Sequence, residues 1–159
     1  MLILNTGGTF NKRYDPISGE LFVPSDNKAV ESIISIFSDR IVVRGMIYKD
    51  SLEMTHEDRE LLGKTISQSD EKLIIVVHGT DTMDLSAQYI SKLALEKVVV
   101  FTGAMVPFSI NTIEATANLS MAIGYAHNAT NAVHIVMQGV CGFYDKVIKN
   151  RELGKFEYV

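Results

Sequence analysis

The stretch Lys72–Met83, KLIIVVHGTDTM, decides the fold class of this chain. Its apolar run, Leu73 to Val77, is continuous rather than alternating, which is typical of a strand buried on both faces in a parallel sheet. A polar cluster follows the run at once: His78, Gly79, Thr80, Asp81 and Thr82. In open α/β sheets, ligands bind outside the carboxyl ends of the strands, so this cluster could form a site. It also fits a helix N-cap, because Thr and Asp are ordinary capping residues.

The rest of the chain alternates between strand-like and helix-like segments. Strands are predicted at 1–5, 41–47, 72–77, 97–102 and 133–138, and helices at 28–37, 55–66, 84–95 and 112–127. Thr55 and Asp58 form a capping-box pattern at the start of one helix. The segment 6–26 is polar, rich in turn residues and long enough to be a lid. No element is predicted for 139–159. This alternation predicts an α/β fold: an open, mostly parallel five-stranded sheet with helices on both faces.

Length and composition limit the possible functions. The chain has 159 residues, 47% of them hydrophobic and 21% charged, which predicts a single globular domain over 1–159. A net charge of −4 makes nucleic acid or an anionic membrane an unexpected partner. The start lacks the features of a signal peptide, and Cys141 is the single cysteine. We expect a cytoplasmic protein with a small-molecule substrate, and no metal or other cofactor, because the histidines are scattered.

A second polar cluster, TGGTF at Thr6–Phe10, follows the first predicted strand. Paired glycines at the end of a strand let the backbone turn sharply and approach a ligand closely. The glycine patterns that bind dinucleotides or nucleoside triphosphates are absent here. The turn therefore presents two threonine hydroxyls.

Together, TGGTF at 6–10 and HGTDTM at 78–83 resemble the asparaginase family of threonine amidohydrolases. Further segments that match the family lie at 50–55, 103–107, 118–119 and 147–149. The resemblance covers essentially all of the chain, but only the N-terminal domain of the family. It implies the Rossmann-like or flavodoxin-like sheet of that domain.

The resemblance also implies a reaction and its residues. Family members hydrolyse L-asparagine, or a related side-chain amide, to aspartate and ammonia through a threonine acyl-enzyme. By position, Thr9 is the implied nucleophile, while Thr80, Asp81 and Lys149 match the second catalytic set. There the lysine lowers the proton affinity of the threonine, and the aspartate orients the amine or binds substrate. Backbone N–H groups around Gly8 and Thr80 are expected to stabilise the oxyanion.

Several positions depart from the pattern of the family. Ser51 matches the serine that holds the α-carboxylate of the substrate, but Leu52 stands where a polar residue is usual. The loop tyrosine that helps to activate the nucleophile falls near Phe22, so Tyr14 is expected to replace it. Glu114 and Ala115 stand where the family has Asp-Gly. Substrate choice is therefore left open by the sequence.

Three hypotheses follow. In the family, the chains continue into a C-terminal domain that supplies an acidic residue to the site across a dimer. We expect this domain to be absent here. The chain is then an amidohydrolase, a non-catalytic module that binds asparagine or aspartate, or the N-terminal half of a split enzyme with a separate C-terminal partner. We also expect a homo-oligomer. On its own, Lys149 fits a solvated charged run with Lys146 and Arg151. The complete set of threonines, Asp81 and Lys149 favours the amidohydrolase.

Overall fold

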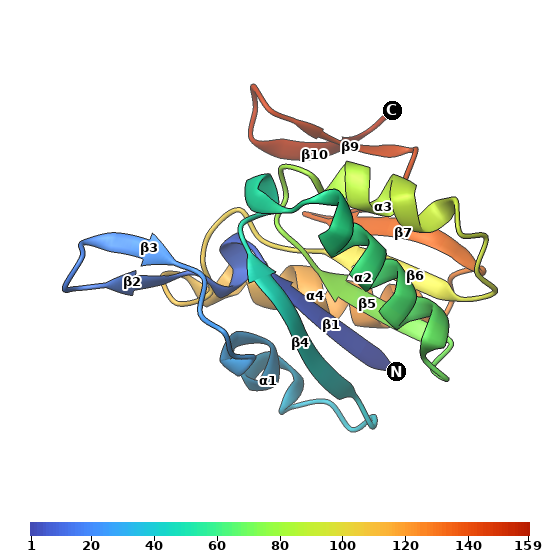
Figure 1. Cartoon of the computed structure of the whole chain (residues 1–159), viewed down its shortest axis with the longest axis horizontal. Coiled ribbons are helices and arrows are strands. Elements are labelled where there is room, and N and C mark those ends of the chain that lie inside the picture. The colour runs from blue at the N-terminus through green and yellow to red at the C-terminus, as the bar shows by residue number, and fades with distance from the viewer.

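A computed structural model describes residues 1–159. Its central sheet has six strands in the order β4-β1-β5-β6-β7-β8 (Figure 1). Their bounds are β1 Leu2–Gly7, β4 Val42–Lys49, β5 Leu73–Val77, β6 Val98–Thr102, β7 Ala132–Met137 and β8 Val140–Phe143. The first five are parallel to their neighbours, and β8 is antiparallel to β7. The mostly parallel α/β sheet is confirmed.

The predicted number of five strands is wrong, because β8 was missed. A two-residue turn, Gln138 and Gly139, sends the chain back along β7 and pairs Met137 with Val140. Both turn residues have positive φ, 52° and 87°, as the favoured two-residue hairpin turns require. Glutamine rarely adopts this conformation, so the turn has no sequence signal of the Asn-Gly kind.

Four helices cover the two faces of the sheet: α1 Lys28–Ile34, α2 His56–Gln68, α3 Met83–Ser91 and α4 Thr112–Ala126. The helices α2 and α3 pack on one face, and α1 and α4 pack on the other (Figure 1). Along β5, Ile74 and Val76 belong to the first core while Ile75 and Val77 belong to the second. Burial of this strand on both faces is therefore confirmed.

The strand order places β1 between β4 and β5, so the direction of the connections reverses next to β1. Ligands of open α/β sheets bind at such a switch point. Here the turns after β1 and β5 touch through their backbones. A Cβ atom on Gly8 would lie 2.5 Å from Cα of Gly79, so only glycine allows this approach.

Two hairpins lie outside the central sheet. The strands β2 (Arg13–Asp15) and β3 (Glu20–Phe22) project away from it, within the segment predicted as a lid (Figure 1). The strands β9 (Val147–Asn150) and β10 (Lys155–Tyr158) form the second pair. The sequence predicted no element here, but Val147 and Phe156 are buried in the core beside α3. This burial holds β9 near the carboxyl end of β5.

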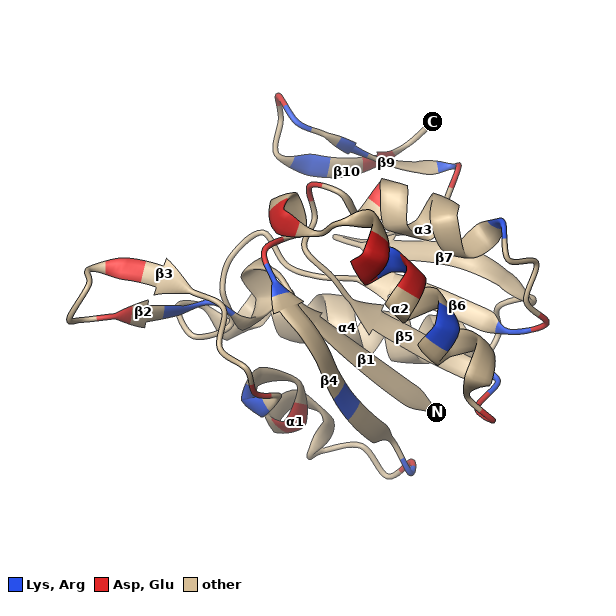
Figure 2. Cartoon of the chain, viewed as in Figure 1, with Lys and Arg blue, Asp and Glu red and all other residues tan.

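Charged side chains avoid the interior of the sheet. Figure 2 shows them on the helices, loops and hairpins and on the edge strand β4, while β1, β5, β6 and β7 carry none. No helix combines the length and the apolar character needed to cross a bilayer.

Candidate active site

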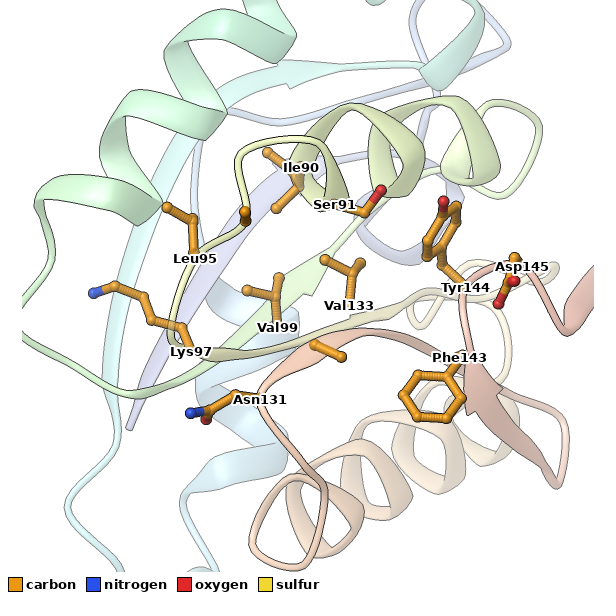
Figure 3. Close-up of a pocket in the computed structure, with 12 residues that line it drawn as sticks. Ile90, Ser91, Leu95, Lys97, Val99, Asn131, Val133, Phe143, Tyr144 and Asp145 are labelled. Carbon is orange, nitrogen blue, oxygen red and sulfur yellow. The ribbon is translucent and has the colours of Figure 1, made fainter.

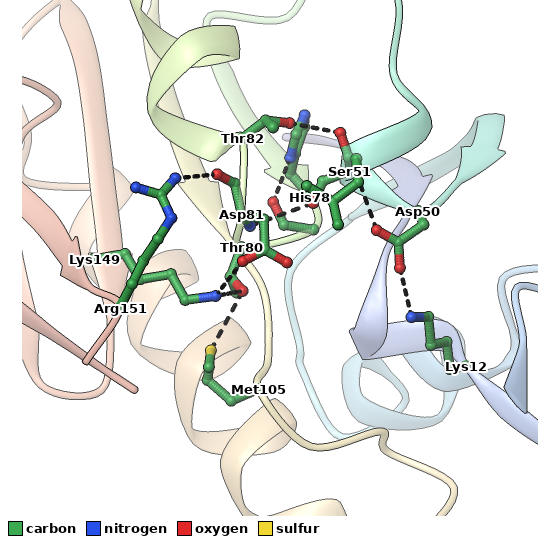
Figure 4. A network of polar contacts seen from close by, with 12 residues as sticks. Lys12, Asp50, Ser51, His78, Thr80, Asp81, Thr82, Met105, Lys149 and Arg151 are labelled. Carbon is green, nitrogen blue, oxygen red and sulfur yellow. Dashed lines mark hydrogen bonds and ion pairs between the residues drawn. The ribbon is translucent and has the colours of Figure 1, made fainter. Parts of the chain in front are cut away.

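Lys149 is the centre of a polar cluster at the carboxyl end of β5. Its Nζ donates to Oγ1 of Thr80 at 2.8 Å and to Oδ1 of Asp81 at 2.7 Å (Figure 4). Only 11% of the Lys149 side chain is exposed. The hairpin β9–β10 therefore brings the lysine to the turn after β5, although Lys149 and Thr80 lie 69 positions apart in the chain.

Ser51 joins this cluster from the turn after β4. Its Oγ accepts a hydrogen bond from the Asp81 N–H at 3.3 Å, and its carbonyl accepts one from Oγ1 of Thr82 at 2.7 Å (Figure 4). Ser51 begins the short 3-10 helix η2, Ser51–Glu53, and is 2% exposed. A Cβ on Gly79 would lie 2.6 Å from Cβ of Ser51. Glycine at 79 is what lets the two turns pack together.

Thr9 is the first residue of the 3-10 helix η1, Thr9–Asn11, directly after two glycines with positive φ. Because Gly8 contacts Gly79, Thr9 and Thr80 each lie one residue from that contact. The Thr9 hydroxyl makes no hydrogen bond within the chain, and its residue is half-buried. The Gly8 N–H was expected to stabilise the oxyanion. It donates a hydrogen bond to the Lys49 carbonyl at 2.9 Å instead. The role of Gly8 is thus the close backbone approach.

Two buried asparagines hold the turn after β1. Asn11 Nδ2 donates to Oδ1 of Asn5 at 2.6 Å and to the Gly7 carbonyl at 3.0 Å. Asn5 Oδ1 also accepts from the Gly7 N–H at 3.2 Å. This pair was not predicted from the sequence. Asn5 alone could have indicated the pair, because asparagine is rare in strands and a buried amide needs hydrogen-bond partners.

The loop after β6 supplies a further contact that the sequence did not indicate. Thr80 Oγ1 donates to the sulfur of Met105 at 3.3 Å (Figure 4). Glu114 fixes the loop, because its Oε2 accepts from the N–H groups of Met105 and Val106 at 3.1 and 3.0 Å. Since the ammonium of Lys149 can only donate, the Thr80 oxygen accepts from the lysine and its own hydrogen faces Met105.

Tyr14 lies outside the cluster, contrary to its expected catalytic position. It lies on β2, is 60% exposed, and its hydroxyl makes no hydrogen bond. Its neighbour Arg13 forms an ion pair with Asp26. Successive side chains on a strand point to opposite faces, so Tyr14 points to solvent. The hairpin that carries it projects away from the sheet (Figure 1).

His78 is buried next to the cluster and is neutral at pH 7. Loss of solvent around the ring lowers the pKa of His78 to about 4, although its bond to the Gly79 carbonyl acts in the opposite direction. The distance from Nδ1 to that carbonyl oxygen is 2.7 Å, so Nδ1 carries the hydrogen. Nε2 is buried without a partner. His78 therefore fixes the Gly79 peptide rather than exchanging protons with solvent.

A cavity of about 390 Å³ lies elsewhere, at the amino ends of β6 and β7 (Figure 3). Its walls are mainly aliphatic, and the ammonium of Lys97 beside it bonds to the carbonyls of Ser69 and Glu71. None of the site residues predicted from the sequence lines it. No three His, Cys, Asp or Glu side chains lie close enough together to hold a metal ion.

A mostly parallel α/β sheet with hydroxyl, ammonium and carboxylate groups gathered at its switch point defines an open-sheet α/β protein with a polar site where such folds bind ligands. The particular family follows from comparison with known proteins. The model of the asparaginase N-terminal domain matches residues 1–156. The chain belongs to the asparaginase family.

Relatives in the family carry two kinds of name. The chain is 31% identical over 137 residues to one subunit of the glutamyl-tRNA(Gln) amidotransferase of Nanoarchaeum equitans, a match that covers 83% of this chain and 35% of that protein. It is 23% identical over 160 residues to the L-asparaginase of Thermococcus kodakarensis, a match that covers 98% of this chain and 47% of that protein. The chain thus spans between a third and a half of these relatives.

Solved structures show the same fold. The thermostable L-asparaginase from Thermococcus kodakarensis matches with a TM-score of 0.87 at 23% identity, over 99% of this chain and 50% of that one. A probable cytoplasmic L-asparaginase from Campylobacter jejuni matches with a TM-score of 0.80 at 24% identity, over 99% and 52%.

Proposed function

We propose that this chain hydrolyses the side-chain amide of asparagine, or a related carboxamide, and releases ammonia, with Thr9 as the nucleophile. The observation that carries the proposal is the pair of bonds from Lys149 to Thr80 and Asp81. A nearby ammonium lowers the proton affinity of a hydroxyl oxygen, because it stabilises the negative charge that develops when the proton leaves. This is the condition that a reaction moving protons through the Thr80 hydroxyl needs.

The proposed reaction has two steps. The Thr9 oxygen bonds to the amide carbon, the carbon–nitrogen bond breaks, and the threonine proton leaves with the nitrogen as ammonia. Water then attacks the ester, which releases the carboxylic acid and returns the proton to Thr9. In the second step, Thr80 takes a proton from the attacking water and passes its own hydroxyl proton to the departing Thr9 oxygen, while Lys149 stabilises the negative charge that develops on the Thr80 oxygen. Asp81 holds Lys149 in place and offers its free oxygen to the substrate.

A second candidate function rests on the relatives. Identity is higher with the glutamyl-tRNA(Gln) amidotransferase protein, at 31%, than with the L-asparaginase, at 23%. This favours a variant of the same chemistry, in which the ammonia released by the chain is used by a partner protein. Free ammonia formed by the purified chain alone, at a rate unaffected by other proteins, would argue against this variant.

The decisive experiment compares Thr9→Ala with Thr130→Ala. Purified protein is incubated with asparagine and with a small panel of other primary amides, and ammonia is measured. We expect Thr9→Ala to remove ammonia release, because the nucleophile is lost, and to change the free energy of unfolding by less than about 1 kcal/mol. Thr130 is exposed in the loop before β7 and is the control. Equal rates in both variants would contradict the proposal.

A further inference from the structure

We propose that Glu114 on α4 and Gln138 in the turn after β7 are positioning residues for the proton relay at Thr80. Their role rests on the proposed function, in which the Thr80 hydroxyl accepts one proton and passes on another. They act through the two hydrogen-bond partners of that hydroxyl, Met105 and Lys149, which lie on separate segments of the chain. Such a relay needs both partners in fixed places.

The carboxylate of Glu114 is shared between two segments of the chain. Its Oε2 accepts from the N–H groups of Met105 and Val106 at 3.1 and 3.0 Å, and its Oε1 accepts from Nε2 of Gln138 at 3.1 Å. The sulfur of Met105 in turn accepts the hydrogen of the Thr80 hydroxyl (Figure 4). One side chain therefore connects the loop that orients the Thr80 hydrogen with the turn after β7.

Gln138 extends this connection to the hairpin that carries Lys149. Its Oε1 accepts from the Phe156 N–H at 3.0 Å, and Phe156 lies directly opposite Lys149 in the β9–β10 pair. The backbone of Gln138 has a φ of 52°, in a turn where glycine, asparagine and aspartate are the favoured residues. The bonds of its side chain, rather than the needs of the turn, therefore account for glutamine at this position.

These contacts close a ring that begins and ends at the Thr80 hydroxyl. Its members, in order, are Thr80, Met105, Glu114, Gln138, Phe156 and Lys149. The ring holds both the donor to the hydroxyl oxygen and the acceptor of its hydrogen. Because misplacing a catalytic group by about 1 Å can cost about 10²-fold in rate, breaking the ring should slow the reaction without removing any group that reacts.

The pair of Glu114 and Gln138 allows an exchange test. A carboxylate can only accept, so the amide of Gln138 gives its Nε2 to Glu114 and keeps its Oε1 for Phe156. In Glu114→Gln, two amide nitrogens face each other, or Gln138 turns over and loses the Phe156 bond. In Gln138→Glu, two carboxylates face each other. The double variant Glu114→Gln/Gln138→Glu again provides an acceptor for every donor and leaves the net charge unchanged.

Steady-state ammonia release on the best amide of the panel compares these variants, with each kcat divided by the folded fraction from circular dichroism. We expect each single variant to lower kcat about tenfold and to leave KM within about twofold, since the substrate contacts remain. The double variant should recover kcat to within about threefold of the unmodified chain. The control is Glu96→Gln, which removes an exposed carboxylate before β6 and should leave kcat unchanged.

Two results would overturn the proposal: single variants with kcat within about twofold of Glu96→Gln, or a double variant no faster than the slower single variant. A general loss of stability does not predict recovery on exchange, whereas the bridge does. If Glu114→Gln does not fold, Gln138→Glu and the double variant provide the same comparison.

A failure of the proposed function can be told apart from a failure of the bridge. If no amide releases ammonia, the hydrolysis proposal fails, and the ¹³C-labelled ε-methyl resonance of Met105 decides the bridge. Met105→Leu assigns this resonance among the seven methionines, and Thr80→Val shows its position without the hydroxyl. Each single variant of the bridge should shift it toward that position, and the double variant should return it. A resonance that neither single variant shifts overturns the bridge.

Discussion

Lys149 connects the hydroxyl of Thr80 with the carboxylate of Asp81 in the candidate site. Two of its three N–H groups are used by Thr80 and Asp81, and its side chain is largely buried. In such surroundings an ammonium acts on the hydroxyl oxygen far more strongly than it would in water. The lysine on β9 therefore places its positive charge against the hydroxyl and the carboxylate at the end of β5.

At this scale we predict that Lys149→Met lowers kcat/KM for ammonia release by about 10²–10³, because charge stabilisation at Thr80 is lost. The matched control is Lys146→Met, since Lys146 lies three residues earlier, is 64% exposed and only loosely paired with Asp145. Steady-state kinetics on the best amide of the panel gives the comparison. If kcat/KM of Lys149→Met lay within twofold of that of the control, Lys149 would have no role in the mechanism.

At the scale of elements, the turn that follows α3 contains a residue in an unfavourable backbone conformation. Beyond the helix, Ala94 has φ of 48° while its N–H donates to the Ser91 carbonyl at 3.2 Å. This left-handed conformation ends many helices and is favourable for glycine rather than for a residue with a Cβ atom.

We predict that Ala94→Gly raises the free energy of unfolding by about 0.5–1 kcal/mol. The reverse is expected for Ala117→Gly, which should lose about 1 kcal/mol, because Ala117 is exposed in the middle of α4. Urea denaturation followed by circular dichroism measures both variants. Destabilisation of similar size in both would show that the strain at Ala94 is not relieved by glycine.

Elements held by local contacts could be predicted from the sequence. The capping box of α2 is one case, with Asp58 N–H bonded to Oγ1 of Thr55 at 3.3 Å and Thr55 N–H bonded to Oδ2 of Asp58 at 2.8 Å. The buried runs of β5 and β6 are another. The strand β8 and the β9–β10 hairpin could not be predicted, because their short segments gain stability from pairing and from contacts with distant core residues.

The same division applies to the candidate site. The motifs indicated Thr9, Ser51, Thr80, Asp81 and Lys149, and the fold brings them to one edge of the sheet. Contacts between motifs, such as Met105 with Thr80, depend on loop geometry that no local pattern encodes. The single-domain organisation, the homo-oligomer and the cytoplasmic location stay predictions.

For the whole molecule, the buried ring of His78 links stability to pH. Its pKa of about 4 in the folded chain lies below the ordinary 6.5, so between these values only the unfolded chain takes up the proton. Stability is then complete above pH 6.5 and decreases as the pH falls toward 4, by about 3 kcal/mol in total.

We predict that lowering the pH from 7 to 5 decreases the free energy of unfolding by about 2 kcal/mol through His78. Carboxyl groups with lowered pKa values, such as Asp26 and Asp58, lose their stabilising effect only at lower pH. Urea titrations at both pH values measure the change. In His78→Gln the difference should become much smaller, and an unchanged difference would assign the pH dependence to other groups.

The contact of Gly8 with Gly79, and of Gly79 with Ser51, makes the site a reporter of the intact fold. Three turns from distant parts of the chain meet there backbone to backbone, so no fragment or partly unfolded state retains the arrangement. In a urea titration, ammonia release and the far-ultraviolet circular dichroism signal should therefore lose half their amplitude at the same concentration. Any mutation that destabilises the fold, wherever it lies, would then lower the rate of ammonia release in proportion to the fraction of unfolded chain.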